Sequence, residues 1–520
     1  MDWYSILIRI LLSVSCFVAS LALYRSLLHP LAKVPGPRTA GITQFWLAIK
    51  VSNGKVHRTQ EHLHRKYGPV VRVAPNEVSL SSADALRSVY AAGSGFLKGP
   101  WYRVAKSPDT IGPGADSLDL LTEENMDRYR LQRRAIGPLY SIAGIEKHEH
   151  HIDRTISRFV TKVKSLNDQF IDLSYWMYIF AVDTLSNITF SEDQGYIEAG
   201  NSGNNFEESH KMWHFMSLTG IFPTIVMFLQ NYALFAKRYN YLLTPLFTAF
   251  GIKSSRPMPM FAWAVGNLQR RLDPASNSED TKGDALTSDL NSDLIQLHQN
   301  RPEFKTSYAQ NMTLTNFGAG TDTISSSLTA ILLCLGSSSS SQRRLHAELD
   351  HALASGSLHS PSTYQEASKL EYLQLCIKEA MRLYPALSMS MTRVHPTKSV
   401  TIDGYHLPAG TIVGINPYVI HQEKSIFGDD ADVFVPERWI PSSKRSVEEI
   451  KNMERNMTTW GCPPRTCPGQ SLAMIVMSKF LTEILAKFEV DVSVDDRTVS
   501  RAYFAIQMTG IKIRFNERRG

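Results

Sequence analysis

The stretch TTWGCPPRTCPGQSLA, residues 458–473, constrains the chain more tightly than any other segment. Prolines and glycines crowd around Cys467, and an apolar pattern with helical spacing follows them. Pro468 suits the first position of a helix, where its missing N–H would have no partner in any case. The pattern therefore predicts a helix over 468–488 with Cys467 at its cap, where the helix dipole and free N–H groups stabilise a thiolate.

The neighbours of Cys467 favour a ligand loop over a merely compressed turn. Gly469 leaves room for a large flat group, and Arg465 can meet a carboxylate on that group. A thiolate at a helix start, beside an arginine and the ring of Trp460, fits the axial ligand of a haem. The chain has 5 cysteines and no CxxC pair, which argues against a disulfide framework or a structural zinc site and indicates a reducing compartment.

The N-terminal stretch from Trp3 to Tyr24 is apolar apart from Arg9 and is long enough to cross a bilayer as a helix. Basic residues follow it at once, so the positive-inside rule places the rest of the chain in the cytosol. A cleaved signal peptide is the alternative, and the cysteine usage argues against it. The sequence predicts an anchor over 1–24, a proline-rich hinge over 25–40 and one catalytic domain over 41–520.

Hydrophobic periodicity predicts a mainly α protein with a smaller β portion, an α+β fold. The net charge is +6 and no long block of Lys and Arg occurs, which suits an acidic protein partner or an anionic membrane better than nucleic acid. Strands are expected over 68–82 and hairpins over 400–420. Helices are expected over 120–142, 144–167, 176–190, 205–250, 308–335, 342–354, 363–384 and 468–488.

The expected helix over 316–335, NFGAGTDTISSSLTAILLCL, contains unfavourable residues for a helix interior. Gly318 and Gly320 each cost about 1 kcal/mol relative to alanine, and threonine hydroxyls can bond back to the helix and bend it. Such a helix is expected to open a groove at Gly320 and to direct Asp322 and Thr323 into a cavity. A kinked core helix with satisfied hydroxyls is the alternative.

Glu379 and Arg382 lie three residues apart in an apolar helical segment, and Arg438 follows in the aromatic, proline-bounded segment FVPERWIP. Each of these three residues, taken alone, more often has a structural role than a catalytic one. Together they predict a buried Glu–Arg–Arg network around a site. Arg393 precedes the expected hairpins.

These motifs together resemble the cytochrome P-450 family of haem-thiolate monooxygenases. The resemblance covers essentially the whole chain and rests on the anchor, the PGP hinge, AGTDT (319–323), the Glu379–Arg382 pair, PERW (436–439) and RTCPG (465–469). The segments HPLAKVPGP and GTIVGINPYVIH resemble fungal members of secondary metabolism.

The resemblance implies roles for individual residues. Cys467 would ligate the iron of haem b. Arg465, Arg393, Arg133 and Tyr129 would hold the propionates, with Trp460 and Gly469 beside the haem. Thr323 and Asp322 would deliver protons, and Glu379, Arg382 and Arg438 would form the structural network. Trp101, Tyr102, Ile111, the segment 212–228 and residues 386–391 would line the substrate pocket.

The chain departs from the family pattern at Trp460, where phenylalanine is usual, and at Pro463, where glycine is usual. Pro463 lacks an N–H, so a shifted haem potential is expected.

The implied activity is insertion of one oxygen atom into a lipophilic molecule by a monomeric enzyme of the endoplasmic reticulum membrane. Electrons would come from an NADPH-dependent flavoprotein reductase, steered by Arg128, Arg130, Arg133 and Arg134; a solvated helix face is the alternative for that cluster. An oxygen-independent isomerase or dehydratase is a second interpretation, against which the Asp322–Thr323 pair argues. A non-catalytic membrane haem protein is the third.

Overall fold

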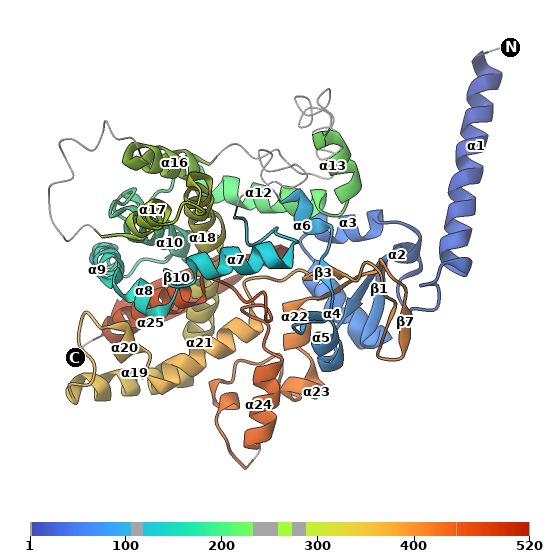
Figure 1. Ribbon diagram of the computed structural model, residues 1–520. Coiled ribbons are helices and arrows are strands. Elements are labelled where there is room, and N and C mark those ends of the chain that lie inside the picture. The colour runs from blue at the N-terminus through green and yellow to red at the C-terminus, as the bar shows by residue number, and fades with distance from the viewer. Residues whose placement is uncertain (1–2, 106–117, 232–257, 273–287, 444, 519–520) are drawn as a thin grey trace.

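The computed structural model of the chain describes residues 3–105, 118–231, 258–272, 288–443 and 445–518 (Figure 1). The second half of the helix expected over 205–250 lies outside these residues, as does Ile111 of the expected pocket. The described part is mainly helical with smaller sheets, as the sequence predicts.

The first helix, α1 (Trp3–Leu23), continues into the short π-helix η1 (Tyr24–Leu28) and projects away from the rest of the molecule (Figure 1). It is long and apolar enough to cross a membrane, and none of its residues is buried. The segment after it is docked on strand β1 (Val70–Ala74), because the Arg72 N–H donates to the Pro35 carbonyl over 2.7 Å. The Arg72 guanidinium also donates to the Arg25 carbonyl over 2.9 Å.

A five-stranded sheet lies next to this segment in the order β1-β2-β8-β5-β3. Its other strands are β2 (Glu77–Leu80), β8 (Ile412–Ile415), β5 (Arg393–Val394) and β3 (Leu97–Lys98). Strands β2 and β8 are parallel, with Glu77 opposite Ile412. Strands from both ends of the sequence thereby meet in one sheet, and the expected strands over 68–82 form β1 and β2. The hairpin β6 (Val400–Ile402) and β7 (Tyr405–Leu407) pairs on its own.

The helices of the first half surround this sheet and extend away from it. They are α2 (Arg38–Ile42), α3 (Phe45–Ser52), α4 (Val56–Tyr67), α5 (Ala83–Tyr90), α6 (Trp101–Val104), α7 (Met126–Ile136), α8 (Ile142–Glu146), α9 (Glu149–Ser165), α10 (Leu173–Phe190), α11 (Tyr196–Ala199), α12 (Asn205–Thr219) and α13 (Pro223–Asn231). The helix expected over 120–142 ends at Ile136, because Pro138 has no N–H with which to continue it.

The helices of the second half pack around a long central helix. They are α16 (Pro259–Leu272), α17 (Leu290–Asn300), α18 (Thr306–Gly336), α19 (Ser339–Ala354), α20 (Tyr364–Ala367), α21 (Glu371–Leu383), α22 (Pro417–His421), α23 (Lys424–Phe427), the 3₁₀ helix η4 (Pro436–Trp439), α24 (Val447–Arg455) and α25 (Gln470–Lys487). Helix α18 has 31 residues and so spans about 46 Å. It contacts α10, α16, α17, α21 and α25, and these helices bury its C-terminal half.

The chain ends in a long antiparallel pair, β9 (Phe488–Tyr503) and β10 (Ala505–Glu517), to which β4 (Ile171–Asp172) adds a third strand. The sequence analysis assigned no strand to this region. The turn of the pair is made by Phe504, which has a φ of 69° and whose ring stacks on Trp101 of α6 and Trp213 of α12.

Candidate active site

The loop before α25 holds Cys467 in a fixed position. The Cys467 N–H donates to the Trp460 carbonyl over 2.8 Å, and the Arg465 N–H donates to the Cys462 carbonyl over 2.8 Å. Gly461 has a φ of 75°, which favours glycine at this turn. The loop is therefore fixed by its own backbone, and Cys467 as a residue is partly buried.

The start of α25 differs from the expectation. The helix begins at Gln470 with Gly469 as its cap, so Pro468 precedes the helix instead of opening it. Burial raises the pKa of the Cys467 thiol, while the Gly469 N–H and the charge of Arg133 act in the opposite direction. The protein alone thus favours the thiol, and a bound metal cation would favour the thiolate.

Gly469 leaves space next to this sulfur. A side chain built there would meet only the Cys467 Sγ within 4 Å, at 4.0 Å. A flat group can approach the sulfur on this side.

Three cations are gathered near the loop, and none of them has a carboxylate partner among the described residues. Lys98 and Arg393 are 6% and 8% exposed, and Arg465 is partly buried. Burial and the charges of Arg465 and Arg393 hold the pKa of Lys98 well below its usual value. Glu123, one of the two acids whose charge acts on Lys98, pairs with Arg128 at 2.6 Å.

The aromatic residues of the region support these cations. The Arg465 guanidinium lies 4.0 Å from the centre of the Tyr129 ring, and its Nη1 donates to the Glu123 carbonyl over 2.7 Å. The Lys98 ammonium lies 4.8 Å from the centre of the Tyr102 ring. Tyr102, expected in the substrate pocket, thus belongs to the cation cluster.

Arg133 adds a fourth positive charge on the side of the thiol. Its Nη1 is buried and has no hydrogen-bond partner among the described residues. A buried guanidinium without a partner is costly, so this atom and the three cations fit an anionic group with several carboxylates. The two propionates of a haem supply such a group.

The central helix presents an open face. Ala319 is exposed although it lies in the middle of the molecule's longest helix, and Thr315 and Thr323, one turn away on either side, are partly exposed. The Thr323 hydroxyl donates to the Ala319 carbonyl over 2.7 Å. The same pattern continues along α18, where Ser326, Ser327 and Thr329 donate to the carbonyls of Asp322, Thr323 and Ser325.

Asp322 is directed away from this face. Its carboxylate accepts from the Ser209 hydroxyl at 2.6 Å and from the Trp213 indole N–H at 2.8 Å, both on α12. Burial raises the pKa of Asp322, and these two hydrogen bonds partly offset that effect. The expected acid and alcohol of α18 therefore have different surroundings, since Thr323 bonds its own helix and Asp322 bonds α12.

The two glycines of α18 serve close packing. A side chain at Gly320 would lie 3.0 Å from Leu185 of α10, and one at Gly318 would lie 3.3 Å from Phe261 of α16. The groove expected at Gly320 is occupied by the neighbouring helix.

Glu379, Arg382 and Arg438 form a fully buried network, each 0% exposed. Glu379 accepts from Arg382 at 2.8 and 2.9 Å and from Arg438 at 3.0 Å. The Trp439 indole N–H and the Val435 N–H complete its partners at 3.0 and 3.2 Å. The three charged residues of this network were predicted from the sequence, whereas Trp439 was not.

His421 connects this network to the cysteine loop. Its Nδ1 donates to the Arg382 carbonyl over 3.1 Å, and its Nε2 accepts from the Thr458 N–H over 2.9 Å. Thr458 in turn accepts from the Gly461 N–H at the start of the cysteine loop. The network thus supports the loop through one histidine, which no local motif indicated.

The chain is similar in sequence to known cytochrome P450 proteins. The sequence model described as "Cytochrome P450" matches residues 35–514. The cytochrome P450 monooxygenase sdnT of Sordaria araneosa is 37% identical, with 97% of this chain and 96% of the relative covered. The cytochrome P450 monooxygenase cicH of Emericella nidulans is 29% identical over 94% of this chain and 93% of the relative. Pisatin demethylase of Fusarium vanettenii is 27% identical over 96% of this chain and 92% of the relative.

Proposed function

We propose, because this chain belongs to the cytochrome P450 family, that Cys467 ligates the iron of its haem and that the enzyme oxidises a lipophilic fungal secondary metabolite. The enzyme is a haem-dependent monooxygenase, as its relatives are named. The observation that carries the residue assignment is the fixed loop that places the Cys467 sulfur next to the open space at Gly469. When bound, haem supplies the chemistry that activates dioxygen.

The surrounding residues would hold the cofactor. Arg393, Arg465 and Lys98 would bind the propionates, and Arg133 would do so with the Nη1 atom that has no hydrogen-bond partner in the described part of the chain. Tyr129 would support Arg465 through its ring. Trp460, whose carbonyl fixes the Cys467 N–H, would cover the sulfur from the side of the loop.

Asp322 and Thr323 would deliver protons to the reacting side. Thr323 would hold a proton at its hydroxyl on the open face of α18. Asp322 would take up protons farther back, where Ser209 and Trp213 orient its carboxylate. The Glu379–Arg382–Arg438 network would hold the cysteine loop through His421.

The electron donor would be an NADPH-dependent flavoprotein reductase. Arg130 and Arg134 are exposed on α7, the helix that also carries Arg133. Arg128 and Arg130 pair with Glu123 and Asp127 at 2.6 and 2.9 Å, so the positive surface offered to an acidic partner is reduced by these neighbours.

The same proposal includes the cellular setting. Residues 1–24 would anchor a monomer in the endoplasmic reticulum membrane, with residues 41–520 as one catalytic domain on the cytosolic side. The apolar helix α1 and the basic residues after it support this orientation.

The test is the spectrum of the reduced, carbon monoxide-bound protein. The wild type should show the red-shifted Soret band of a thiolate ligand, and Cys467→Ala should lose it. Cys462→Ala changes the matched cysteine of the same loop and should keep the band. Cys467→His provides a variant that can still bind haem, with an unshifted band. A red-shifted band in Cys467→Ala would refute the assignment, and product formation without NADPH and reductase would refute the monooxygenase reaction.

A further inference from the structure

The tip of the β9–β10 hairpin has a backbone conformation that its side chain disfavours. Phe504, the single residue between the two strands, has a φ of 69°. It is the only aromatic residue among the described non-glycine positions with a positive φ. Glycine adopts this conformation without strain, whereas a bulky residue there is uncommon. The chain thus carries an aromatic ring at a position where the ring strains the backbone, which points to a use for the ring.

The Phe504 ring contacts two indoles at once. It stacks on Trp101 of α6 with a centroid distance of 4.8 Å and an interplanar angle of 11°. It also stacks on Trp213 of α12, with a centroid distance of 5.1 Å and an angle of 17°. Both tryptophans were expected to line the substrate pocket, and they are only 8% and 5% exposed. They are instead packed on the hairpin tip, which joins α6 to α12.

The residue before Phe504 makes a parallel contact with the same helix. The Tyr503 ring stacks on His214 of α12 with a centroid distance of 4.2 Å. Two consecutive residues of the tip therefore contact two consecutive residues of α12. The Tyr503 hydroxyl also donates to the Ser52 carbonyl over 3.3 Å. These contacts fix the position of the tip along α12.

The backbone around Phe504 is bound to a segment outside the hairpin. The Ser388 N–H donates to the Phe504 carbonyl over 3.1 Å. The Ile506 N–H donates to the Ala386 carbonyl over 2.8 Å. The tip cannot relax the φ of Phe504 without disturbing these bonds, so the ring is held where it contacts Trp213.

Trp213 is the side chain through which the tip reaches the acid of α18. Its Nε1 donates to the Asp322 carboxylate over 2.8 Å, and the Ser209 hydroxyl donates to the same carboxylate over 2.6 Å. An indole has a single N–H, so the bond exists only in the ring orientation that directs this atom at Asp322. A ring that lies nearly parallel to Phe504 cannot turn out of this orientation without losing the stack. Phe504 therefore restricts the indole to the orientation that serves Asp322.

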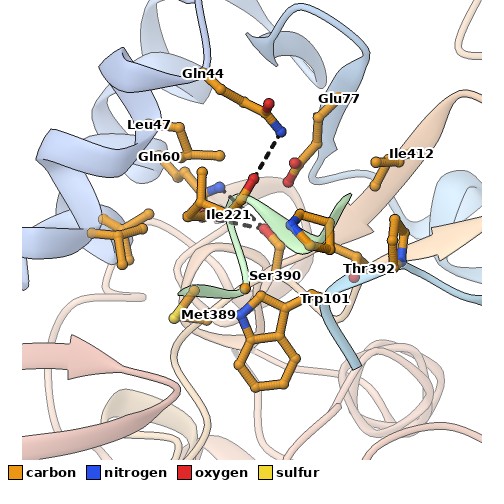
Figure 2. Close-up of a pocket in the computed structure, with 15 residues that line it drawn as sticks. Gln44, Leu47, Gln60, Glu77, Trp101, Ile221, Met389, Ser390, Thr392 and Ile412 are labelled. Atoms are coloured by element: carbon orange, nitrogen blue, oxygen red, sulfur yellow. Dashed lines mark hydrogen bonds between the residues drawn. The ribbon is translucent and has the colours of Figure 1, made fainter. Parts of the chain in front are cut away.

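Trp101 supports the Phe504 ring from α6. A side chain at Gly220, where α12 ends, would lie 2.1 Å from the Trp101 Nε1, so the end of α12 leaves room for this indole. Figure 2 shows Trp101 at one edge of a small pocket, whose free volume is about 40 Å³. Pockets that bind organic ligands usually have about 300–1,000 Å³. Trp101 is therefore a packing residue that supports the hairpin tip.

We propose that Phe504 is a positioning residue for the reaction, because its ring holds the Trp213 indole in the orientation that donates to Asp322. The proposal rests on the proposed function, which gives Asp322 its part in proton delivery. The Asp322 carboxylate keeps both of its donors on α12 only while the indole is aligned in this way. The hairpin tip thereby acts on the acid without touching it.

Two other titratable side chains lie near Asp322. Burial and the charge of Asp322 raise the pKa of Tyr178 on α10. Burial, together with the charge of Arg501, lowers the pKa of His210 to about 4, and His210 lines a small cavity with Asp322. Neither side chain changes its charge between about pH 5 and 8. A shift of a pH profile in that range is therefore not caused by these two groups.

The first measurement follows the indole and needs no turnover. The full-length haem-loaded protein carries ¹⁵N-labelled tryptophan and is studied by NMR in detergent, as its diamagnetic reduced carbon monoxide complex. The indole N–H resonance that is missing in Trp213→Phe belongs to Trp213. This N–H should be protected from hydrogen exchange in the wild type. In Phe504→Leu it should exchange about tenfold faster, which corresponds to the loss of one hydrogen bond to a charged group.

The second measurement follows the acid. Phe504→Leu should move the acidic limb of the pH profile of peroxide release to higher pH by up to about one unit, because a carboxylate that loses a hydrogen bond is a weaker acid. The double variant Trp213→Phe/Phe504→Leu should match Trp213→Phe alone, since Phe504 acts on Asp322 only through the indole. Phe504→Tyr keeps an aromatic ring at the tip and should match the wild type in both measurements.

A matched substitution at the other end of the hairpin serves as the control. Phe515 is 3% exposed and contacts the rings of Phe159 and Phe488. Phe515→Leu therefore tests whether a loosened hairpin alone has these effects, and it should leave the exchange of the Trp213 N–H and the pH profile unchanged. Phe504→Gly suits the φ of 69° and provides a second variant without the ring if Phe504→Leu does not fold. Circular dichroism verifies that each variant is folded.

Two results would overturn the proposal. The first is a Trp213 N–H that exchanges as slowly in Phe504→Leu and Phe504→Gly as in the wild type. The second is a pair of shifts that add up in the double variant. Failure of the proposed proton delivery has a different signature, because Asp322→Asn would then leave peroxide release unchanged while the exchange of the Trp213 N–H still depended on Phe504.

Discussion

Substituting Glu379 by glutamine should destabilise the enzyme strongly while changing almost no volume. The carboxylate is 0% exposed and accepts hydrogen bonds from Arg382, Arg438, Trp439 and Val435. A glutamine can keep one oxygen in place, but its NH₂ group must then face donors. The less costly orientation keeps the three bonds to Oε1 and loses those from the Arg382 Nε and the Trp439 Nε1.

The expected loss of stability depends on which arginine is left without a carboxylate partner. Arg438 keeps Asp430, which lies 2.6 Å from its Nη1, whereas no other carboxylate pairs with Arg382 among the described residues. Breaking one partner out of a buried ion pair costs about 3–5 kcal/mol. The free energy of unfolding of an ordinary protein is only about 5–15 kcal/mol. We therefore expect much of the variant to lose its fold or its haem.

The assay is urea unfolding of the haem-loaded protein, followed by circular dichroism and by the Soret band. Glu437→Gln is the matched control, since Glu437 is 44% exposed and its partner Arg344 is 51% exposed. An exposed pair contributes about 0–1 kcal/mol. A free energy of unfolding for Glu379→Gln within about 1 kcal/mol of the wild type would refute the reasoning.

Three further predictions concern pH, proton delivery and the haem. Burial lowers the pKa of His421 from 6.5 to about 3, so the unfolded chain takes up a proton at a higher pH than the folded chain. Urea unfolding should therefore show a free energy of unfolding that declines below pH 6.5 by up to about 1.4 kcal/mol per pH unit from this group. A constant free energy of unfolding between pH 7 and 5 would contradict this. Trp213→Phe removes a hydrogen-bond donor to Asp322 and should raise the pKa of this acid further. The acidic limb of the pH profile of peroxide release should therefore move to higher pH. An unmoved profile would argue against the hydrogen bond between Trp213 and Asp322. Pro463→Gly restores an N–H near the cysteine and should raise the haem reduction potential in spectroelectrochemistry, because hydrogen bonds near the sulfur weaken its electron donation; an unchanged potential would exclude a role for this proline.

The motifs that could be predicted from the sequence are those whose residues lie close together along the chain. Glu379 and Arg382 are one helical turn apart, and the glycines and prolines around Cys467 belong to a single loop. Their chemistry is visible because local spacing alone brings the groups together.

The residues that sequence reasoning missed act across long separations. Ser209 and Trp213 meet Asp322 from another helix, and His421 joins Arg382 to Thr458. Lys98 joins Arg393 through the pairing of β3 with β5. Single residues of ordinary type carry no signal of such contacts, so only the fold identifies them.

The glycines of α18 illustrate a different limit. The sequence correctly marks Gly318 and Gly320 as unusual in a helix interior. The sequence does not say whether the missing side chain makes room for a ligand or for a neighbouring helix. The close approach of Leu185 and Phe261 shows that it makes room for neighbouring helices.

The hydroxyl groups along α18 have a consequence for how easily this helix can bend. Four carbonyls of α18 each accept a hydrogen bond from a side-chain hydroxyl in addition to the N–H of the helix. They belong to Ala319, Asp322, Thr323 and Ser325. Such a carbonyl keeps one hydrogen bond when the backbone N–H of the helix moves away from it. This stretch is therefore where the helix can bend with the least loss of backbone hydrogen bonding.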